Sequence, residues 1–333
     1  MMGNHDELIC AFLLSGDKPG RELSWQEVQD WTPDQGNIWV HFDCTHPGTG
    51  DWLRAESSIA PYVLEGLLAD ETRPRCDSYD EGALIILRGV NLNPDARPED
   101  MVSIRVWADS SRVITTRLRR LMAVDDIRNQ MPTGKGPATP GQFLAKLAGR
   151  LIDRMGPVID TLSDQTSELE EALIGSEEES NLEDMRHKLN ELRRVAIALR
   201  RYISPQKEAL RRLNHLDEDW MEEEVQGPML EVVDRITRIN EELEEIRERA
   251  SVIQDELANR LAQRMGGTMY LLTLVATIIM PLSFVTGLLG INVGGIPGSE
   301  NPWAFAIVCA MMAAVGIGMF MLFKKMKWLT IPK

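Results

Sequence analysis

The sequence is poor in cysteine and in positive charge, and each shortage excludes a class of protein. Its 333 residues include four cysteines, which lie far apart and form no CxxC pair: Cys10, Cys44, Cys76 and Cys309. Nothing in this spacing indicates a disulfide framework, which is consistent with a reducing compartment. The formal net charge is -15, from 36 Lys and Arg against 51 Asp and Glu. Nucleic acid is therefore excluded as a partner, because binding to phosphate backbones requires surplus Lys and Arg.

Sequence motifs for catalysis are also missing. The chain has no glycine-rich phosphate loop, no nucleophile elbow and no HExxH. An ATP-driven or hydrolytic role thus has no support from the sequence. We predict that the protein is not an enzyme and requires no cofactor.

Charge disappears almost completely near the C-terminus. Residues 265–323 carry a single charged side chain, Glu300. The uncharged runs Met269–Ile291 and Asn301–Phe323 are 23 residues each, enough to cross a hydrocarbon core about 30 Å thick. Two buried helices of a soluble protein would each carry a charged stripe. We therefore predict transmembrane helices over 265–291 and 303–323, in contact with a lipid bilayer.

Basic residues flank the two spans on one side only. Arg260 and Arg264 precede the first span, and the tail 324–333 begins with Lys324 and Lys325, whereas the loop 292–302 has no Lys or Arg. The positive-inside rule places both termini in the cytoplasm and the loop outside. We predict a multi-pass protein of the inner, or plasma, membrane.

Residues 1–135 have the pattern of a cytosolic α/β domain. Apolar, β-rich runs alternate with short helical stretches, and Met131–Gly141 has the proline and glycine content of a linker. The predicted strands are Cys10–Leu14, Ile38–Cys44, Ala83–Val90, Val102–Ala108 and Val113–Leu118. The predicted helices are Ser24–Trp31, with Ser24 as N-cap, and Ala60–Ala69.

Residues 136–264 change to long helices of a cytosolic stalk. We expect Pro205 to start a fresh helix or to kink the existing one. A later helix repeats apolar residues at strict four-three spacing, which is typical of a coiled-coil seam. The members of this seam are Val232, Ile236, Ile239, Leu243, Ile246, Ala250, Ile253 and Leu257. Because no turn separates the seam from the first span, we predict one continuous helix over Pro228–Gly290.

One face of the first span carries small, hydroxyl or thioether side chains. They are Met269, Thr273, Ala276, Thr277, Met280, Ser283 and Gly287. Two interpretations stay open: the face packs against another membrane helix, or it lines a pore. Pro281 favours the pore, because its missing N–H leaves the carbonyl of Thr277 in need of a partner or a water-filled cavity.

The first span ends in Gly290-Ile291-Asn292, followed by Val293-Gly294-Gly295-Ile296-Pro297. A Gly-apolar-Asn triplet at the outer end of the first of two C-terminal spans resembles the Gly-Met-Asn signature of the CorA-type divalent metal-ion transporters. The Gly-Ile-Asn variant resembles the ZntB zinc-transporter branch of that family. Pro281, the long stalk helix and the lysine-rich tail agree with this resemblance.

The resemblance implies an α+β protein that assembles as a homopentamer, with a funnel of α/β domains and stalk helices above a central pore. Gly290, Ile291 and Asn292 would form the outer mouth, where the Asn292 amides contact a hydrated cation. The hydroxyl and thioether face would line the pore, and Glu300 and Asp255 would attract cations. The branch implies Zn²⁺ as the transported ion, with Mg²⁺, Co²⁺, Ni²⁺ or Cd²⁺ as alternatives, because the pore segment holds no thiolate or imidazole to select zinc.

Two further interpretations come from the residues. The densest set of metal-ligand residue types is formed by His41, Asp43 and His46, beside Cys44. One interpretation is a regulatory zinc site, and the alternative is a buried strand with a polar end. A membrane-anchored coiled-coil scaffold that conducts nothing is the alternative from another class. Neither span contains Asp, Glu, His or Lys to carry a proton, so we predict passive or weakly coupled flux.

Overall fold

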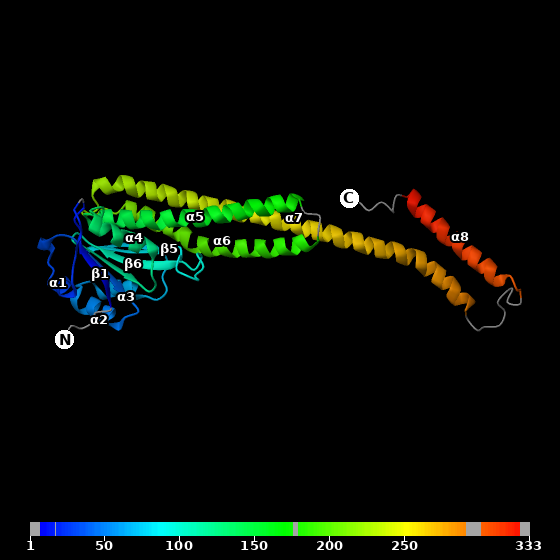
Figure 1. Cartoon of the computed structure of the whole chain (residues 1–333), viewed down its shortest axis with the longest axis horizontal. Helices are drawn as coiled ribbons and strands as arrows, with labels where there is room; N and C mark the ends of the chain where they lie inside the picture. The colour runs from blue at the N-terminus through cyan, green and yellow to red at the C-terminus, as the bar shows by residue number, and fades with distance from the viewer. Residues whose placement is uncertain (1–6, 17, 176–178, 291–300, 327–333) are drawn as a thin grey trace. The chain divides into compact units, whose positions relative to one another are not determined.

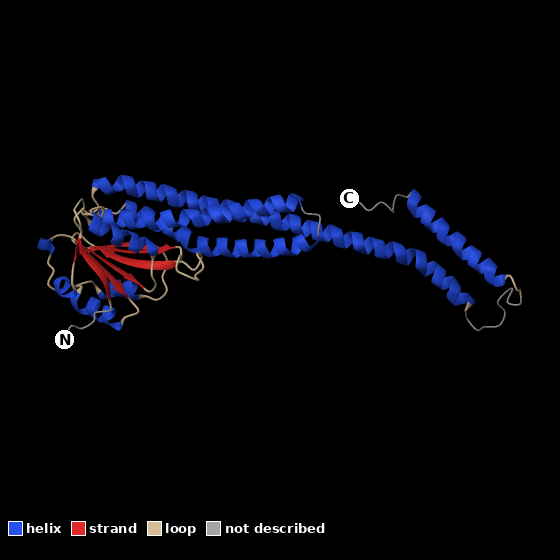
Figure 2. Cartoon of the chain, viewed as in Figure 1, coloured by secondary structure: helices blue, strands red, loops and turns tan. Residues whose placement is uncertain are grey.

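The structure is a computed structural model that describes residues 7–16, 18–175, 179–290 and 301–326. It divides into two compact units, Met1–Ile253 and Gln254–Lys333. The first unit contains a β-sheet and long helical segments. In its described part, the second unit contains the apolar end of one long helix and a further apolar helix (Figures 1 and 2).

The first unit is built on a seven-stranded sheet of order β2-β1-β3-β7-β6-β5-β4. Among the described strands, β3 and β7 alone pair in parallel, while the other neighbours are antiparallel. The strands are β1 (Leu8–Leu13), β2 (Arg21–Glu22), β3 (Ile38–Asp43), β4 (Arg75–Tyr79), β5 (Gly82–Gly89), β6 (Val102–Ala108) and β7 (Arg112–Arg117). The five predicted strands are confirmed, and β2 and β4 are additions that carry no apolar run.

Helices cover both faces of this sheet (Figure 2). On one face, short helices contribute Val28, Leu53 and Leu67 to a buried cluster with strand residues such as Phe42 and Ile86. These are α1 (Trp25–Gln29), η1 (Pro33–Gln35), α2 (Pro47–Glu56) and α3 (Pro61–Leu68). Ser24 caps α1 in a full capping box with Glu27, as predicted.

The other face of the sheet is covered by α4 (Met122–Gln130), η2 (Met131–Thr133), α5 (Pro140–Gly175) and α6 (Glu179–Asn214). The predicted linker Met131–Gly141 is shorter than expected, since η2 takes its first three residues and α5 its last two. Helix α6 continues through Pro205, so the predicted alternative of a fresh helix there is wrong, and the alternative of a kink stays a prediction. Its neighbours Ile203 and Gln206 are fully buried, and this packing holds the helix together across the missing N–H.

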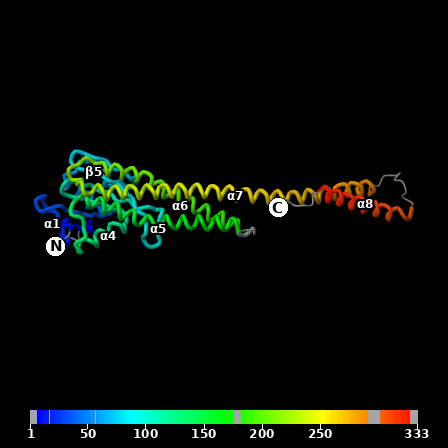
Figure 3. The backbone as a smooth tube through the Cα atoms, turned by 90° about the horizontal axis from the view of Figure 1, so that it is seen from above, coloured from blue at the N-terminus to red at the C-terminus, as the bar shows by residue number. Residues whose placement is uncertain are grey.

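The N-terminal part of α7 (Glu223–Leu289) packs beside α5 and α6 (Figures 1 and 3). Every residue of the predicted seam is buried, so the four-three repeat does bury a continuous apolar stripe. Ion pairs join α7 to its neighbours: Arg235–Asp153 at 2.6 Å, Arg200–Glu244 at 2.7 Å and Arg249–Glu170 at 2.7 Å. The prediction of one helix from stalk into span is confirmed.

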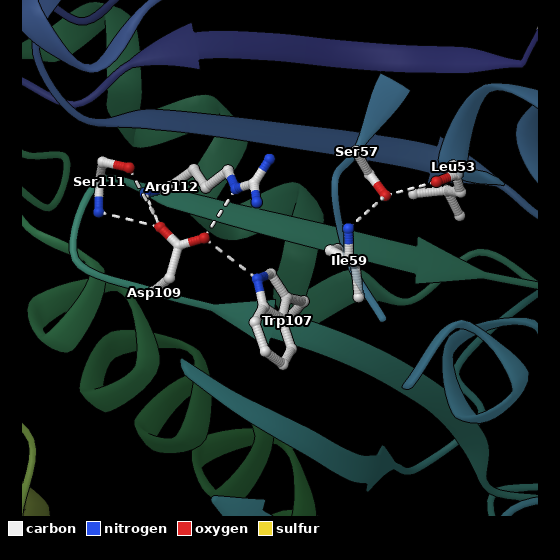
Figure 4. Close-up of polar contacts among 7 residues, drawn as sticks. All are labelled: Leu53, Ser57, Ile59, Trp107, Asp109, Ser111 and Arg112. Carbon is white, nitrogen blue, oxygen red and sulfur yellow. Dashed lines mark hydrogen bonds and ion pairs between the residues drawn. The ribbon is translucent and has the colours of Figure 1, made fainter. Parts of the chain in front are cut away.

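A buried carboxylate closes the β6–β7 hairpin (Figure 4). Asp109 accepts hydrogen bonds from the backbone N–H groups of Ser111 and Arg112, both at 3.0 Å. The indole N–H of Trp107 donates to the same carboxylate at 3.1 Å, and Arg112 Nε donates at 2.7 Å. One side chain therefore satisfies donors from the turn, the strand and the core.

We expect Asp109→Ala to lower the free energy of unfolding of the N-terminal unit by about 2–4 kcal/mol, because it leaves the buried indole N–H of Trp107 and the half-buried donors of Ser111 and Arg112 without an acceptor. Denaturant unfolding followed by tryptophan fluorescence measures this. Asp51→Ala is the matched control: its ion pair with Arg54 is long, 3.5 Å, and 83% of the Asp51 side chain is exposed, so its effect should stay within about 0.5 kcal/mol. Equal effects of the two substitutions would contradict the role given to Asp109.

Candidate transport site

The second unit holds the two helices whose length and apolar character suit a membrane span. Among the described residues, these are the C-terminal part of α7 and α8 (Ala304–Lys325). Neither has an apolar stretch buried inside the chain itself. A soluble protein would not leave so much apolar surface in water, and a lipid environment removes this cost. The predicted spans thus coincide with helices.

One side of α7 in this unit packs toward α8. Leu274, Ile278, Leu282 and Val285 are only partly exposed and recur at helical spacing. On α8, a matching stripe of reduced exposure includes Met312, Gly316 and Phe323. A Cβ added at Gly316 would lie 4.0 Å from Leu282 Cδ1, so the two stripes approach closely. All four residues on this side of α7 are aliphatic.

The side of α7 with hydroxyl, thioether and small residues stays exposed. Met269 and Met280 are 68% and 71% exposed, and the other members of the set, Thr273, Ala276, Thr277, Ser283 and Gly287, are exposed as well. Since α8 lies against the aliphatic side, this face is left for lipid, for water or for another copy of the chain. If this face packs against another membrane helix, that helix is therefore not the α8 of the same chain.

The threonine hydroxyls on this face bond to their own helix. Thr273 Oγ1 donates to the Met269 carbonyl at 2.8 Å, and Thr277 Oγ1 donates to the Thr273 carbonyl at 2.7 Å. Their protons are thus used, and the oxygens remain free to accept. The helix continues past Pro281, which has no N–H to give to the Thr277 carbonyl. The face consequently presents acceptor oxygens suited to the protons of a hydrated cation.

The segment predicted to form the outer mouth is described only at its beginning. Helix α7 ends at Leu289, and the N–H of Gly290 donates to the carbonyls of Thr286 at 2.9 Å and Gly287 at 3.2 Å. Ile291, Asn292 and Glu300 lie outside the described residues, so their assigned roles stay predictions. Asp255 is exposed on α7, which leaves its carboxylate open to solvent.

The predicted metal site at His41, Asp43 and His46 is not formed. His41 is 1% exposed, and its Nδ1 lies 2.8 Å from Thr115 Oγ1, which also accepts from Trp39 Nε1. Burial lowers the pKa of His41 to about 3, so the ring is a neutral core residue. Asp43 instead accepts from Thr45, and His46 is exposed before α2. Within residues that the structure describes, no group of three His, Cys, Asp or Glu is arranged to hold a metal ion.

The cysteines do not supply a soft metal ligand in the first unit either. Burial raises the pKa values of Cys10 and Cys76 to about 12, and burial also raises the pKa of Cys44. These thiols stay protonated near neutral pH, whereas metals bind the thiolate. The oxygens and thioethers of α7 are therefore the ligand types that the described part of the span offers.

Known proteins match this chain over nearly its whole length. The family model described as CorA-like Mg²⁺ transporter protein matches residues 34–325. The divalent cation transporter CmaX of Pseudomonas aeruginosa is 40% identical over 330 residues, which cover 98% of each chain. The zinc transport protein ZntB of Yersinia enterocolitica is 33% identical over 291 residues, which cover 87% of this chain and 88% of that protein.

A solved structure agrees with these matches. The structure of full-length CmaX superposes with a TM-score of 0.82 at 38% identity, covering 98% of this chain and 100% of that one. An N-terminal α/β region, long helices and two C-terminal apolar helices are therefore shared features, as the sequence predicted. The resemblance stated from Gly290-Ile291-Asn292 is confirmed by matches that extend far beyond those three residues. The chain belongs to the CorA-like Mg²⁺ transporter family.

Proposed function

We propose that this protein conducts divalent metal cations across the inner membrane through a pore lined by α7. The observation that supports this most is the exposed face from Met269 to Gly287, whose hydroxyl oxygens are held as acceptors by bonds to their own helix. A divalent ion sheds its water reluctantly, so neutral acceptors that bind its hydration shell allow passage without trapping the ion.

The pore requires several copies of the chain. One helix cannot enclose water, and α8 lies on the aliphatic side of α7, so the opposite face is free to meet its equivalents. The family resemblance supports a homopentamer, with five α7 helices around the axis and five α8 helices outside. A ring of five Asn292 amides would then stand at the outer mouth, with Glu300 and Asp255 attracting cations at the two ends.

The orientation follows from the basic flanks. Arg264 precedes the exposed apolar part of α7, and Lys324 and Lys325 end α8, so the positive-inside rule supports cytoplasmic termini. The N-terminal unit would then form the cytosolic funnel. This topology places the Gly-Ile-Asn segment outside, where the ion meets the pore first on uptake.

Zn²⁺ is the ion that we propose as substrate. One relative is named a zinc transport protein and another a divalent cation transporter, and the Gly290-Ile291-Asn292 variant resembles the zinc branch. Mg²⁺, Co²⁺, Ni²⁺ and Cd²⁺ are the alternatives within the same mechanism, since oxygen acceptors do not by themselves favour zinc. A non-conducting scaffold is disfavoured, because it has no use for acceptor oxygens on a membrane face.

We expect purified protein in liposomes to take up Zn²⁺ faster than Mg²⁺, Co²⁺ or Ni²⁺, as measured with an entrapped metal-sensitive dye. Asn292→Ala should lower Zn²⁺ flux by about tenfold, the factor for about 1.4 kcal/mol of lost stabilisation. Asn301→Ala is the control, since it removes an amide that lies before α8 and accepts from the Trp303 N–H. Equal flux in all three proteins would remove Asn292 from the mouth, and no flux at all would remove the transport function.

A second substitution tests the lining face. Thr273→Val keeps the side-chain shape but removes an acceptor oxygen, so flux should fall about threefold or more, in line with a net hydrogen bond of about 0.5–1.5 kcal/mol. Thr286→Val is the matched control, because Thr286 also donates to its own helix but lies outside the proposed lining set. If the two variants conduct equally, whatever the level, Thr273 does not line the pore.

The absence of Asp, Glu, His and Lys from the two spans of the sequence leads to a further expectation. Zn²⁺ uptake should be nearly independent of an imposed pH gradient, because no Asp, Glu, His or Lys occurs within them to carry a proton. Uptake is measured at one internal pH against a series of external values, with an ionophore to clamp the membrane potential. A steep and reversible dependence on the gradient would show that coupling uses groups outside the spans.

A further inference from the structure

A cavity of about 790 Å³ lies in the first unit between the sheet and α6. Its walls are the segments 70–73, 99–103 and 118–119, the end of β5 and one turn of α6. Small-molecule sites have volumes of about 300–1,000 Å³, so the space suits a compact ligand. None of the residues assigned to transport lines it.

Arginines converge on this cavity without carboxylate partners. Arg73, Arg88, Arg119 and Arg201 line it, and Arg105 lies fully buried behind the wall. In the described part of the chain, none of these five makes an ion pair within 4.0 Å. Such a concentration is unexpected in a protein of net charge -15.

The two innermost guanidinium groups have only neutral hydrogen-bond partners. Arg88 donates to the carbonyls of Met101 and Thr72 at 2.7 and 2.8 Å. Arg105 donates to the carbonyls of Ala69 and Asp70, and its Nε and Nη1 have no partner among the described residues. Carbonyl dipoles compensate a buried cation only in part, so positive potential remains at the wall of the cavity.

An aromatic ring holds two of the like charges close together. The Cζ atoms of Arg88 and Arg201 lie 4.0 and 5.5 Å from the ring centroid of Tyr202, which is within the range of cation–π attraction. Burial lowers the pKa of Arg88, and repulsion from Arg201 adds to this, while Tyr202 and Glu71 oppose it. Burial likewise lowers the pKa of Arg105, with Arg88 adding to the shift and Cys44 and Asp70 opposing it. An anion between these groups would relieve the repulsion.

The carboxylates around the cavity lie mostly at its rim. Asp70, Glu71 and Asp100 are exposed there, as are Arg73, Arg119 and Arg201, so solvent screens the two sets alike. Glu99 is buried, but Arg194 on α6 already neutralises it at 3.1 Å. The inner wall is thus positive while the rim is mixed.

We propose that this cavity binds a phosphate-class anion, namely a polyphosphate chain that is either free or part of a nucleotide. Several guanidinium forks match phosphate oxygens in pairs, and the volume exceeds the needs of a single phosphate. The wall is tied to α6 through Arg88, whose backbone N–H donates to Gln206 at 2.6 Å, and through the Glu99–Arg194 pair. A bound anion would therefore hold α6 more firmly against the sheet.

The test is calorimetric titration of the full-length protein in detergent with tripolyphosphate, ATP and adenosine, in a buffer without divalent cations. Tripolyphosphate and ATP should bind saturably and raise the unfolding temperature, while adenosine should not bind. Equal affinity for the two phosphates indicates that the chain of phosphates alone is recognised, and tighter ATP binding indicates the nucleotide.

The double variant Arg119→Gln, Arg201→Gln should weaken binding by at least about tenfold, since it removes charge-assisted contacts. Both side chains are exposed, so the fold should persist. The control Arg211→Gln, Arg238→Gln removes the same charge from exposed arginines outside the cavity and should bind as the wild type does. The proposal is overturned by absent binding of both phosphates at about millimolar concentration, by equal affinity of the two double variants, or by adenosine binding without tripolyphosphate.

Discussion

A single helical backbone carries two different burial patterns, and the rest of the molecule depends on its continuity. Up to Ile253, α7 buries a four-three stripe within the first unit, with Ile236 and Ala250 fully enclosed. From Met269 onward it has no charged side chain, and its faces differ by size and hydroxyl content instead. Gly266 and Gly267 between the two parts cost about 1 kcal/mol each in helix propensity, yet the helix does not end there. Apolar packing of the part before the glycines and a lipid environment around the part after them favour the helical state more strongly than the glycines oppose it.

The hydrocarbon core of the bilayer also limits which polar groups α7 can present. Polar groups in a bilayer must be satisfied within the structure, and the donation from Thr277 to the Thr273 carbonyl meets that demand. The same bond fixes the hydroxyl oxygen as an acceptor that faces outward. Selectivity on such a surface depends on the hydration and charge of the ion, whereas thiolate or imidazole ligands would select by softness. A zinc transporter of this kind would separate zinc from Mg²⁺ only modestly at the lining face, and stronger discrimination would have to arise at the Gly290-Ile291-Asn292 mouth.

The sequence predicted the periodic elements well and the local chemistry less well. Long helices and apolar strands repeat their pattern over many residues, so isolated exceptions such as Pro205 do not hide them. Strand β4, with the sequence Arg-Cys-Asp-Ser-Tyr, and helix α2, which begins Pro-Gly-Thr-Gly, lack such a pattern and form because tertiary neighbours complete them. His41 was misjudged for a related reason. Alternation along β3 puts His41 and Asp43 on one face of the strand, but the partner Thr115 lies 74 residues away and cannot be found by local analysis.

The arginines beside α6 show the same limit of local sequence analysis, here for a cavity that the sequence did not predict. Arg88 and Arg105 interrupt strands that otherwise have the composition of a sheet core, and the sequence cannot tell whether such a charge meets a carboxylate. In the fold their guanidinium groups donate to backbone carbonyls, and the carboxylates that line the same cavity form no ion pair with them. An acidic protein attracts cations to its surface, which suits a transporter of divalent metals. A cationic recess within that field is costly to maintain, and a bound anion gives it a physical reason to exist.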